Sequence, residues 1–124
     1  MWVYQQDTGK MYSHYQVLVA TGYAGGNEGN NPEGINNPDM QNVKAIGPLP
    51  KGAYTFGEPI LKSNLGPFAI PLIPDENNKM FGRDGFFCHG DTTPSGNASK
   101  GCIIMPRAIR EAMWASPERQ LMVV

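Results

Sequence analysis

Both cysteines and one of the two histidines of this chain lie close together between residues 86 and 104. A thiol becomes an effective nucleophile when a neighbouring group lowers its pKa or removes its proton, and an imidazole can do both. Cys102 and His89 could form such a pair, although thirteen positions separate them. Each lies at the end of an apolar, strand-like segment, and a polar loop over residues 90–100 joins the two segments. Pairing of these strands would therefore bring the thiol and the imidazole side by side.

The surroundings of this pair also favour catalysis. Gly90 and Gly101 remove side chains where the backbone of a peptide substrate would approach. Successive N–H groups of Lys100, Gly101 and Cys102 could form an oxyanion hole. The hydroxyl of Ser99 is available to orient the loop or the imidazole. These residues are predicted to bind substrate or to stabilise the oxyanion.

Three other readings of the same residues remain open. A disulfide between Cys88 and Cys102 is one, but alternation along a strand sends Cys88 to the face opposite His89. A zinc site is the second, and it would have to combine Cys88, His89 and Cys102 with His14. No Cys-x-x-Cys or His-x-x-x-His spacing supports such a site. Two buried structural thiols beside a core histidine are the third reading. The polar, glycine-bearing setting favours the catalytic pair, and we expect no metal and no cofactor.

The composition indicates one folded domain spanning residues 1–124. The hydrophobic fraction is 40% and the formal net charge is −1, so the chain carries no basic surface for nucleic acid or anionic membranes. No apolar run approaches the roughly 20 residues of a membrane-spanning helix. The stretch MWVYQQDTGK lacks the features of a signal peptide. We therefore expect synthesis in the cytoplasm without an export signal of its own.

The elements that would position the pair are predicted to be mainly strands, because 15 glycines and 11 prolines favour turns over long helices. Residues 2–6 and 10–21 are expected to pair as a hairpin around a turn at residues 7–9. Residues 22–42 are rich in Gly, Asn and Pro and are expected to form a long surface loop, either a binding loop or a disordered insertion.

The second half of the chain continues the strand pattern. Tyr54 and Phe56 are spaced to share one face of a strand. A single helix is expected after Pro106, which suits a first helical position, and it ends before Ser116-Pro117. Further strands or hairpins are expected at residues 66–73, 86–88, 102–105 and 120–124. The prediction is a mainly β domain with one short helix.

The order His-Gly followed by Ser-x-Gly-Cys-Ile, at residues 89–90 and 99–103, resembles the signature of the L,D-transpeptidase (YkuD-like) catalytic domain. A wider set of landmarks is similar to the type VI secretion L,D-transpeptidase effector family and spans nearly the whole chain. These landmarks are Trp2-x-Tyr4-x-Gln6, Thr21-Gly22-Tyr23-x-Gly25, Gly47-Pro48-x-Pro50-x-Gly52-x-Tyr54, Gly82-Arg83 and Ala98-Ser99-x-Gly101-Cys102-Ile103-Ile104.

The resemblance implies a mainly β, sandwich-like catalytic fold that acts on bacterial peptidoglycan stem peptides. It implies that Cys102 is the nucleophile, that His89 is the general base, and that the backbone carbonyl of Gly90 orients the imidazole. The bond attacked would join the third residue, commonly meso-diaminopimelate, to the D-alanine at position four. Water would then complete an L,D-carboxypeptidase reaction, whereas an amine would complete crosslinking or D-amino-acid exchange.

The resemblance also implies a biological setting. Effectors of this family are antibacterial toxins that a secretion apparatus delivers into the periplasm of a rival cell. The producing cell keeps a periplasmic immunity protein. An absent signal peptide would fit such delivery.

The chain departs from the broad family after the cysteine. Many members continue the motif as Cys-Ile-Arg, whereas this chain has Ile104 at that position. The substrate-binding role of that arginine would then be vacant or fall to Arg83 or Arg107. Tyr23 from the landmark set is also expected near the substrate. The short separation between His89 and the cysteine suggests a small loop over the site.

Two alternative functions remain. Another cysteine peptidase or amidase of cell-wall peptides is the first, but in the NlpC-like class the catalytic cysteine precedes the histidine, and no histidine follows Cys102. A non-catalytic wall-binding module of the same fold is the second. It predicts that Cys102→Ala leaves binding and biological effect intact.

Overall fold

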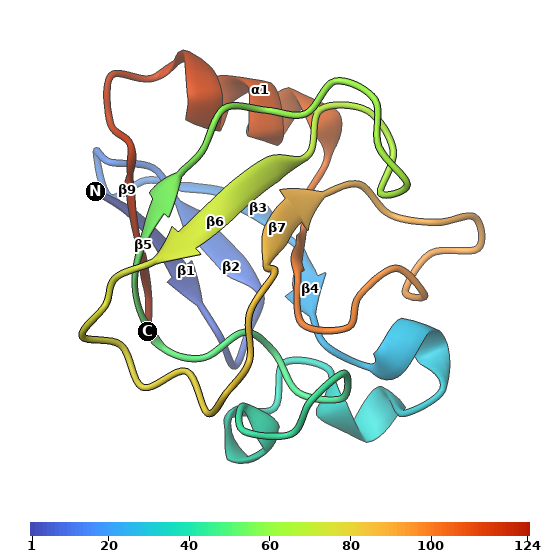
Figure 1. Cartoon of the computed structure of the whole chain (residues 1–124). Coiled ribbons are helices and arrows are strands. Elements are labelled where there is room, and N and C mark those ends of the chain that lie inside the picture. The colour runs from blue at the N-terminus through green and yellow to red at the C-terminus, as the bar shows by residue number, and fades with distance from the viewer.

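The computed structural model describes all 124 residues and contains one continuous sheet of nine strands with a single α-helix (Figure 1). The sheet is mixed: β1 and β9 are parallel, β7 and β8 are parallel, and the other neighbours are antiparallel. The predicted mainly β fold with one short helix is confirmed. In the order β3-β2-β1-β9-β5-β6-β7-β8-β4, the strands are Leu18–Thr21, Lys10–Tyr12, Trp2–Gln5, Gln120–Val123, Gly52–Phe56, Ile70–Pro74, Phe87–His89, Ile103–Ile104 and Tyr23–Ala24.

The sheet is nearly closed into a barrel, and the closure depends on one glycine. The two edge strands, β3 and β4, are consecutive in the chain and are joined by Gly22. The N–H of Gly22 donates to the carbonyl of Gly9 at 2.8 Å. A Cβ at residue 22 would lie 1.8 Å from the carbonyl oxygen of Ile104, so no other residue fits there without moving β8. The two ends of the sheet are therefore brought together beside the strand that follows Cys102.

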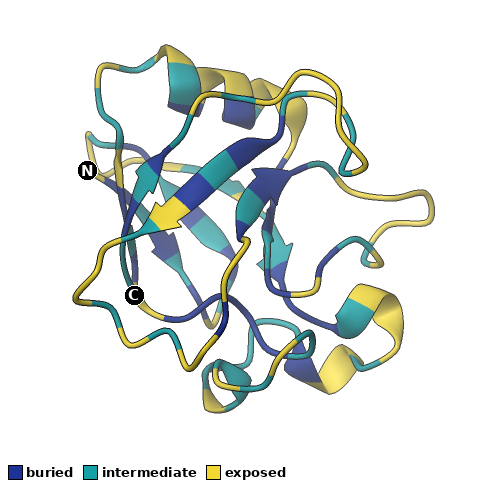
Figure 2. Ribbon diagram, viewed as in Figure 1, coloured by how far each residue is buried: buried dark blue, intermediate teal, exposed yellow.

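The core fills the inside of this sheet with alternate residues of the strands. Tyr4, Tyr54 and Leu121, from β1, β5 and β9, are each no more than 1% exposed. Phe56 is also buried, so the predicted shared face of residues 54 and 56 is confirmed. Figure 2 shows buried segments along the strands and exposed residues along the loops. Burial of each large apolar side chain contributes about 1.5–3 kcal/mol, which explains why this alternation fixes the strand register.

The first predicted hairpin is present, but its second strand is shorter than expected. Residues 10–21 divide into β2 and β3, which are separated by a turn in which Ser13 N–H donates to Val17 O at 2.8 Å. Gln16 adopts a φ of 65° in this turn. Because strand residues cannot adopt such a φ, the expectation of one continuous strand was wrong.

Residues 22–42 lie mostly at the surface, as expected, but they contain a short strand and three 3-10 turns and are not a disordered insertion. Tyr23 and Ala24 form β4, which pairs with β8. Three 3-10 turns follow, and the buried Gly34 packs its backbone against Ile46. Backbone hydrogen bonds within this segment and to Ser99 replace the missing apolar core contacts. The turns η1, η2 and η3 are Asn27–Gly29, Pro32–Gly34 and Pro38–Met40.

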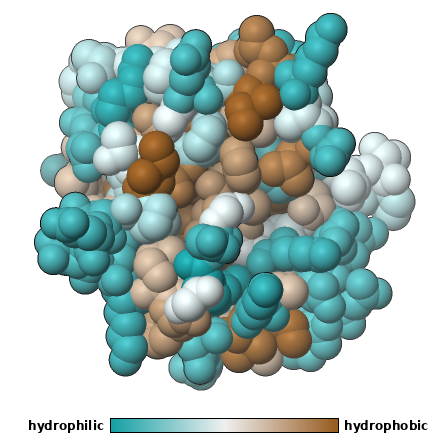
Figure 3. Space-filling view, in the orientation of Figure 1, coloured by the Kyte–Doolittle hydropathy of each residue, from teal (hydrophilic) through white to brown (hydrophobic).

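The helix α1, Arg107–Ala115, lies across one end of the sheet (top of Figure 1). Pro106 is its N-cap and Ser116 its C-cap, in agreement with the predicted helix to within one residue. Its buried side chains are Arg110 and Met113. With nine residues, it falls short of the length that a membrane crossing requires. On the face shown in Figure 3, hydrophobic residues form separate small groups among hydrophilic ones.

Candidate active site

The strands β7 and β8 bring the segments of the predicted nucleophile and base together. They are parallel, with Cys88 opposite Ile103 and His89 opposite Ile104. Cys102 directly precedes β8. The alternation of strand residues, continued back from Ile104 to Cys102, predicts that Cys102 and His89 lie on the same face. The expected pairing of these two segments is therefore present.

Cys88 points the other way. Its side chain is completely buried in the core, where burial raises the pKa of the thiol to about 12. Both cysteines carry free thiols. The disulfide reading is contradicted, because the strand alternation separates the two side chains.

The thiol of Cys102 is half-buried and held by the backbone of the neighbouring strand. Phe87 N–H donates to Cys102 Sγ at 3.3 Å. Burial raises the pKa of this thiol above its ordinary value, while the Phe87 N–H and the positive charge of Arg83 act in the opposite direction. The thiol is therefore neutral at rest, and it needs a base to remove its proton.

His89, the predicted base, has a defined tautomer. Its side chain is only 3% exposed, and Nδ1 lies 2.9 Å from the carbonyl oxygen of Gly90. Because a carbonyl can only accept, Nδ1 must carry the proton and donate it, which leaves Nε2 free to accept. Burial lowers the pKa of His89, and the nearby charge of Arg110 lowers it further, so the imidazole is neutral. No hydrogen bond joins it to Cys102 in this structure, and such contacts often tighten only when substrate binds.

Ser99 orients the loop before the cysteine. Its hydroxyl donates to the carbonyl of Cys102 at 2.6 Å and accepts from the N–H groups of Gly25 and Gly101 at 2.8 and 3.0 Å. The side chain is only 1% exposed. Of the two roles expected for this hydroxyl, the structure shows contacts to the loop and none to His89. The Gly101 N–H donates to this hydroxyl and is therefore not free for an oxyanion hole. Of the three N–H groups expected to form the hole, those of Lys100 and Cys102 remain.

Arg83 has a different role from the substrate-binding one expected. It is 6% exposed, and its two terminal nitrogens donate to four backbone carbonyls, which belong to Gln41, Gly47, Pro48 and Lys100 at 2.6–3.2 Å. The guanidinium also lies 5.1 Å from the centre of the Phe86 ring. Its donors are therefore committed to the backbone, and its position fixes the loop that carries Cys102 and places a positive charge near the thiol.

The two glycines of the motif make room for arginines. Gly101 has a φ of 132°, and a Cβ there would lie 2.7 Å from both Arg83 Nη2 and a carbon of the Phe86 ring. A Cβ at Gly90 would lie 3.0 Å from Arg110 Nη2. The close approach that these glycines permit is therefore to the protein's own side chains, which corrects the expectation of a substrate backbone at these positions.

Tyr23 and Asp91 hold the loop between β7 and Cys102. The Tyr23 hydroxyl donates to Asp91 and accepts from Ala98 N–H at 3.0 Å. Asp91 also accepts from the N–H groups of Thr92 and Gly96 at 2.8 and 3.1 Å. Burial and the hydrogen bond to Asp91 raise the pKa of Tyr23. Tyr23 is thus a loop anchor at the site, and Asp91 has a turn-forming role.

Comparison with known proteins shows the family of this chain. A family model described as the Tlde1 domain matches residues 21–123 of the chain. The chain belongs to this family, the type VI L,D-transpeptidase effectors. No curated protein was found with a sequence similar to this one. Membership makes the domain a peptidoglycan-related effector and confirms the resemblance drawn from the motifs. The first twenty residues lie outside the match, but β1 and β2 pair within the same sheet.

Three hollows lie near the predicted pair of this Tlde1 domain, and none of them is lined by both residues. One of about 210 Å³ is lined by Cys102, Arg83, Lys44 and Lys100. The ammonium group of the exposed Lys100 lies 3.0 Å from the carboxylate of Glu28. Another hollow, of about 280 Å³, is lined by His89. The largest, of about 460 Å³, is lined by neither Cys102 nor His89.

Sequence reasoning missed Arg110. This residue of α1 is 4% exposed, lines the largest hollow, and donates through Nη1 to the carbonyls of Pro67 and Phe68 at 2.8 Å each. Charged residues are rarely buried, so its type predicted an exposed position. The available signal was its spacing of three from Met113, which places both on the inward face of the helix.

The four residues of the zinc reading do not come together. No group of three or more His, Cys, Asp or Glu side chains gathers anywhere in the chain. His14, which the zinc reading required, packs instead between the rings of Trp2 and Tyr15.

Proposed function

We propose that this domain is a cysteine L,D-carboxypeptidase or L,D-transpeptidase that cleaves peptidoglycan tetrapeptide stems between the third residue and D-alanine. The observation that supports the proposal is the parallel pairing of β7 with β8, because it brings the segment that ends in His89 beside the segment that begins after Cys102. The hydrogen bond from His89 Nδ1 to Gly90 supports it, because this bond leaves Nε2 as the proton acceptor. Family membership supplies the substrate class.

Acylation follows from the protonation states of the two groups. As Sγ of Cys102 attacks the carbonyl carbon of the third residue, His89 Nε2 takes the thiol proton. The tetrahedral intermediate carries a negative oxygen, and the N–H groups of Cys102 and Lys100 are the candidates to stabilise it, because Ser99 occupies the one between them. When the C–N bond breaks, the leaving D-alanine amine takes the proton from His89. The product is a thioester on Cys102.

Deacylation uses the same base. His89 removes a proton from water, the hydroxide attacks the thioester carbonyl, and Cys102 leaves and recovers its proton. The result is a tripeptide stem. An incoming amine can replace water, and the product is then a crosslinked stem or a stem with a different D-amino acid at position four.

The hollow that contains Cys102 suits the acyl-donor stem. Lys44 and Lys100 line it, and the one free carboxylate of meso-diaminopimelate, at the end of its side chain, is a group that such cations attract. The biological role we propose is that of the family: delivery into the periplasm of a target bacterium, damage to its wall there, and a matching periplasmic immunity protein in the producer.

The test is product analysis with purified muropeptides that carry tetrapeptide stems. Under reducing conditions the wild-type protein should release D-alanine, and Cys102→Ala and His89→Ala should lower the rate by at least about a hundredfold. Added D-amino acids separate exchange from hydrolysis in the same chromatogram. Intact stems with folded wild-type protein would refute the enzymatic proposal.

A cellular version of the experiment tests the biological role. Export of the wild-type chain into the periplasm of a Gram-negative bacterium should slow growth, and export of Cys102→Ala should not. Equal toxicity of the two proteins would favour a wall-binding module instead.

A further inference from the structure

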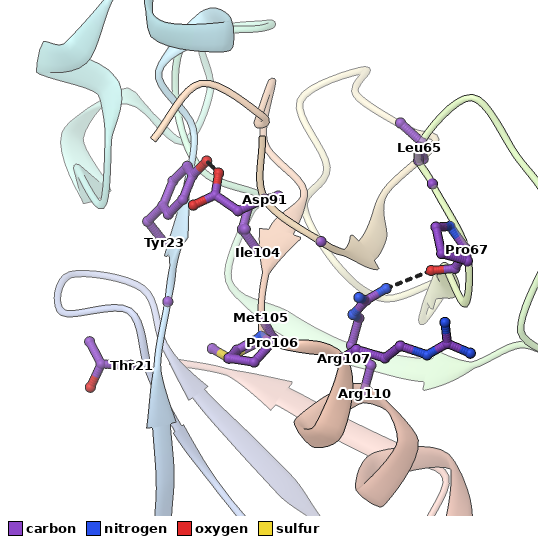
Figure 4. Close-up of a pocket in the computed structure, with 13 residues that line it drawn as sticks. Thr21, Tyr23, Leu65, Pro67, Asp91, Ile104, Met105, Pro106, Arg107 and Arg110 are labelled. Carbon is purple, nitrogen blue, oxygen red and sulfur yellow. Dashed lines mark hydrogen bonds between the residues drawn. The ribbon is translucent and has the colours of Figure 1, made fainter. Parts of the chain in front are cut away.

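The largest hollow adjoins the hollow that is lined by His89. The two share four lining residues, which are Leu65, Gly66, Gly90 and Asp91. From there the larger hollow of about 460 Å³ extends between the loop at residues 65–67 and the first turn of α1 (Figure 4). The two hollows are therefore neighbours, and a molecule bound in one can extend towards the other.

Arg110 lines this hollow and leaves part of its guanidinium without a hydrogen-bond partner. Its Nη1 makes both hydrogen bonds to the carbonyls of Pro67 and Phe68, one of which is drawn in Figure 4. Its Nε is buried without any partner, and Nη2 makes no hydrogen bond. The Nε and Nη2 atoms together form the fork that binds a carboxylate through two parallel hydrogen bonds. A buried N–H without a partner is costly, so this edge calls for an acceptor from outside the chain.

The rest of the hollow also favours an anion. The first turn of α1 contains no acidic residue, and no side chain caps it, so the partial positive charge of the helix start is not compensated. Arg107 lines the hollow as well, although it is half exposed and pairs with Glu111 at 2.8 Å. The one acidic residue in the lining, Asp91, already accepts from Tyr23 and from two backbone N–H groups.

The position of the base decides which part of the substrate lies here. The proton that His89 takes from the thiol must be given to the leaving amine, so the leaving residue lies on the His89 side of the cleaved bond. At the end of a tetrapeptide stem, that residue carries a free carboxylate. The guanidinium of Arg110 and the carboxylate of the leaving D-amino acid are thus expected on the same side of the site.

We propose that the Arg110 hollow is the subsite for the D-amino acid that leaves, with the Nε and Nη2 edge of Arg110 bound to its carboxylate. The inference rests on the proposed function and adds a specificity determinant to it. In the exchange reaction the acceptor D-amino acid occupies the same subsite, and the size of the hollow leaves room for side chains larger than a methyl group.

The first test changes the substrate and leaves the protein intact. A tetrapeptide stem that ends in D-alanine is compared with the same stem ending in D-alaninamide. Because a charge-assisted bidentate contact is lost, wild-type kcat/KM should fall about tenfold to a hundredfold for the amide. Arg110→Lys, which keeps the charge without the fork, should lose most of this preference. Arg119→Lys, which changes an arginine stacked on Trp114 outside the hollow, should retain it.

The outcomes separate the two proposals. Equal turnover of acid and amide by the wild-type protein would overturn the subsite and leave the proposed function standing. No turnover of either peptide would refute the proposed function. For that case, the same peptides are titrated into Cys102→Ala while the Arg110 Nε–H signal is followed by NMR. A shift with the acid alone supports the subsite, and no shift or equal shifts overturn it.

Discussion

Arg83 and Arg110 are both buried arginines near the predicted catalytic pair, but they use their donors differently. Arg83 gives its terminal N–H groups to four carbonyls around the Cys102 loop. Arg110 gives one nitrogen to two carbonyls and keeps a whole edge without partners. The comparison shows that burial alone does not tell a structural arginine from a binding one. The number of donors left over makes the distinction.

The charges of Arg83 and Arg110 also act on different members of the predicted pair. The charge of Arg83 acts on Cys102, where it opposes the increase of the thiol pKa that burial causes. The charge of Arg110 acts on His89, where it adds to the decrease of the imidazole pKa. One arginine thus favours the thiolate, and the other favours the neutral base.

Of the changes that test this difference between the two arginines, Arg83→Ala is expected to have the largest effect, and the effect is on stability. Four carbonyls would lose their donor, and unsatisfied buried polar groups cost about 1–3 kcal/mol each. Because such losses are not additive, we expect the free energy of unfolding to fall by at least about 3 kcal/mol in urea denaturation. Arg119→Ala is the matched control and should cost less, because this half-buried arginine between α1 and β9 donates to a single carbonyl, that of Ser116. A loss below about 1 kcal/mol for Arg83→Ala would contradict the structural role.

A smaller effect is expected for Arg110→Gln, in which the pH profile of kcat/KM should shift. The neutral imidazole is the active form, so activity is lost as the pH falls through the pKa of His89. Burial and Arg110 lower that pKa, and the acidic limb of wild-type kcat/KM should therefore lie below the ordinary histidine value of about 6.5. Removal of the positive charge should raise the pKa and move the limb to higher pH, as measured from rate profiles.

Arg83→Gln provides the comparison for this shift. Its acidic limb should stay in place, whereas the pH profile of Cys102 alkylation by iodoacetamide should move upwards, because the thiolate loses a nearby positive charge. An unchanged profile in both variants would show that neither charge reaches its expected partner.

The smallest effect is expected for Cys88→Ala. Its side chain faces the core, so the change should lower the free energy of unfolding by about 1–2 kcal/mol and leave kcat/KM little altered. Denaturation and turnover assays on the same preparation measure both quantities. Loss of turnover in a folded Cys88→Ala protein would revive a functional link between the two thiols.

The sequence predicted the parts of the site that depend on strand alternation. The spacing of Tyr54 and Phe56, the strands around His89 and Cys102, and the opposite orientation of Cys88 follow from a period of two, and a period of two is visible in a single sequence. The residue types at these positions also carried the family motif. Those predictions needed no knowledge of distant contacts.

The sequence did not predict features that depend on contacts between distant segments. Tyr23 and Ala24 form a strand only because β8 lies beside them, and two residues give no periodic signal. Arg110 is buried because the carbonyls of residues 67 and 68 point at it, and nothing in its own neighbourhood indicates them. The left-handed φ of Gly101 likewise depends on Arg83 and Phe86, which arrive from another loop.

Gly22 joins the first and last strands of the sheet, and this affects how the domain behaves among other proteins. A sheet that ends in open edges offers rows of free N–H and C=O groups to which a foreign chain can add a strand. Here the end strands have four and two residues and meet at one glycine. The fold thus resists aggregation through its topology, and a side chain at position 22 would expose that liability as well as displace β8.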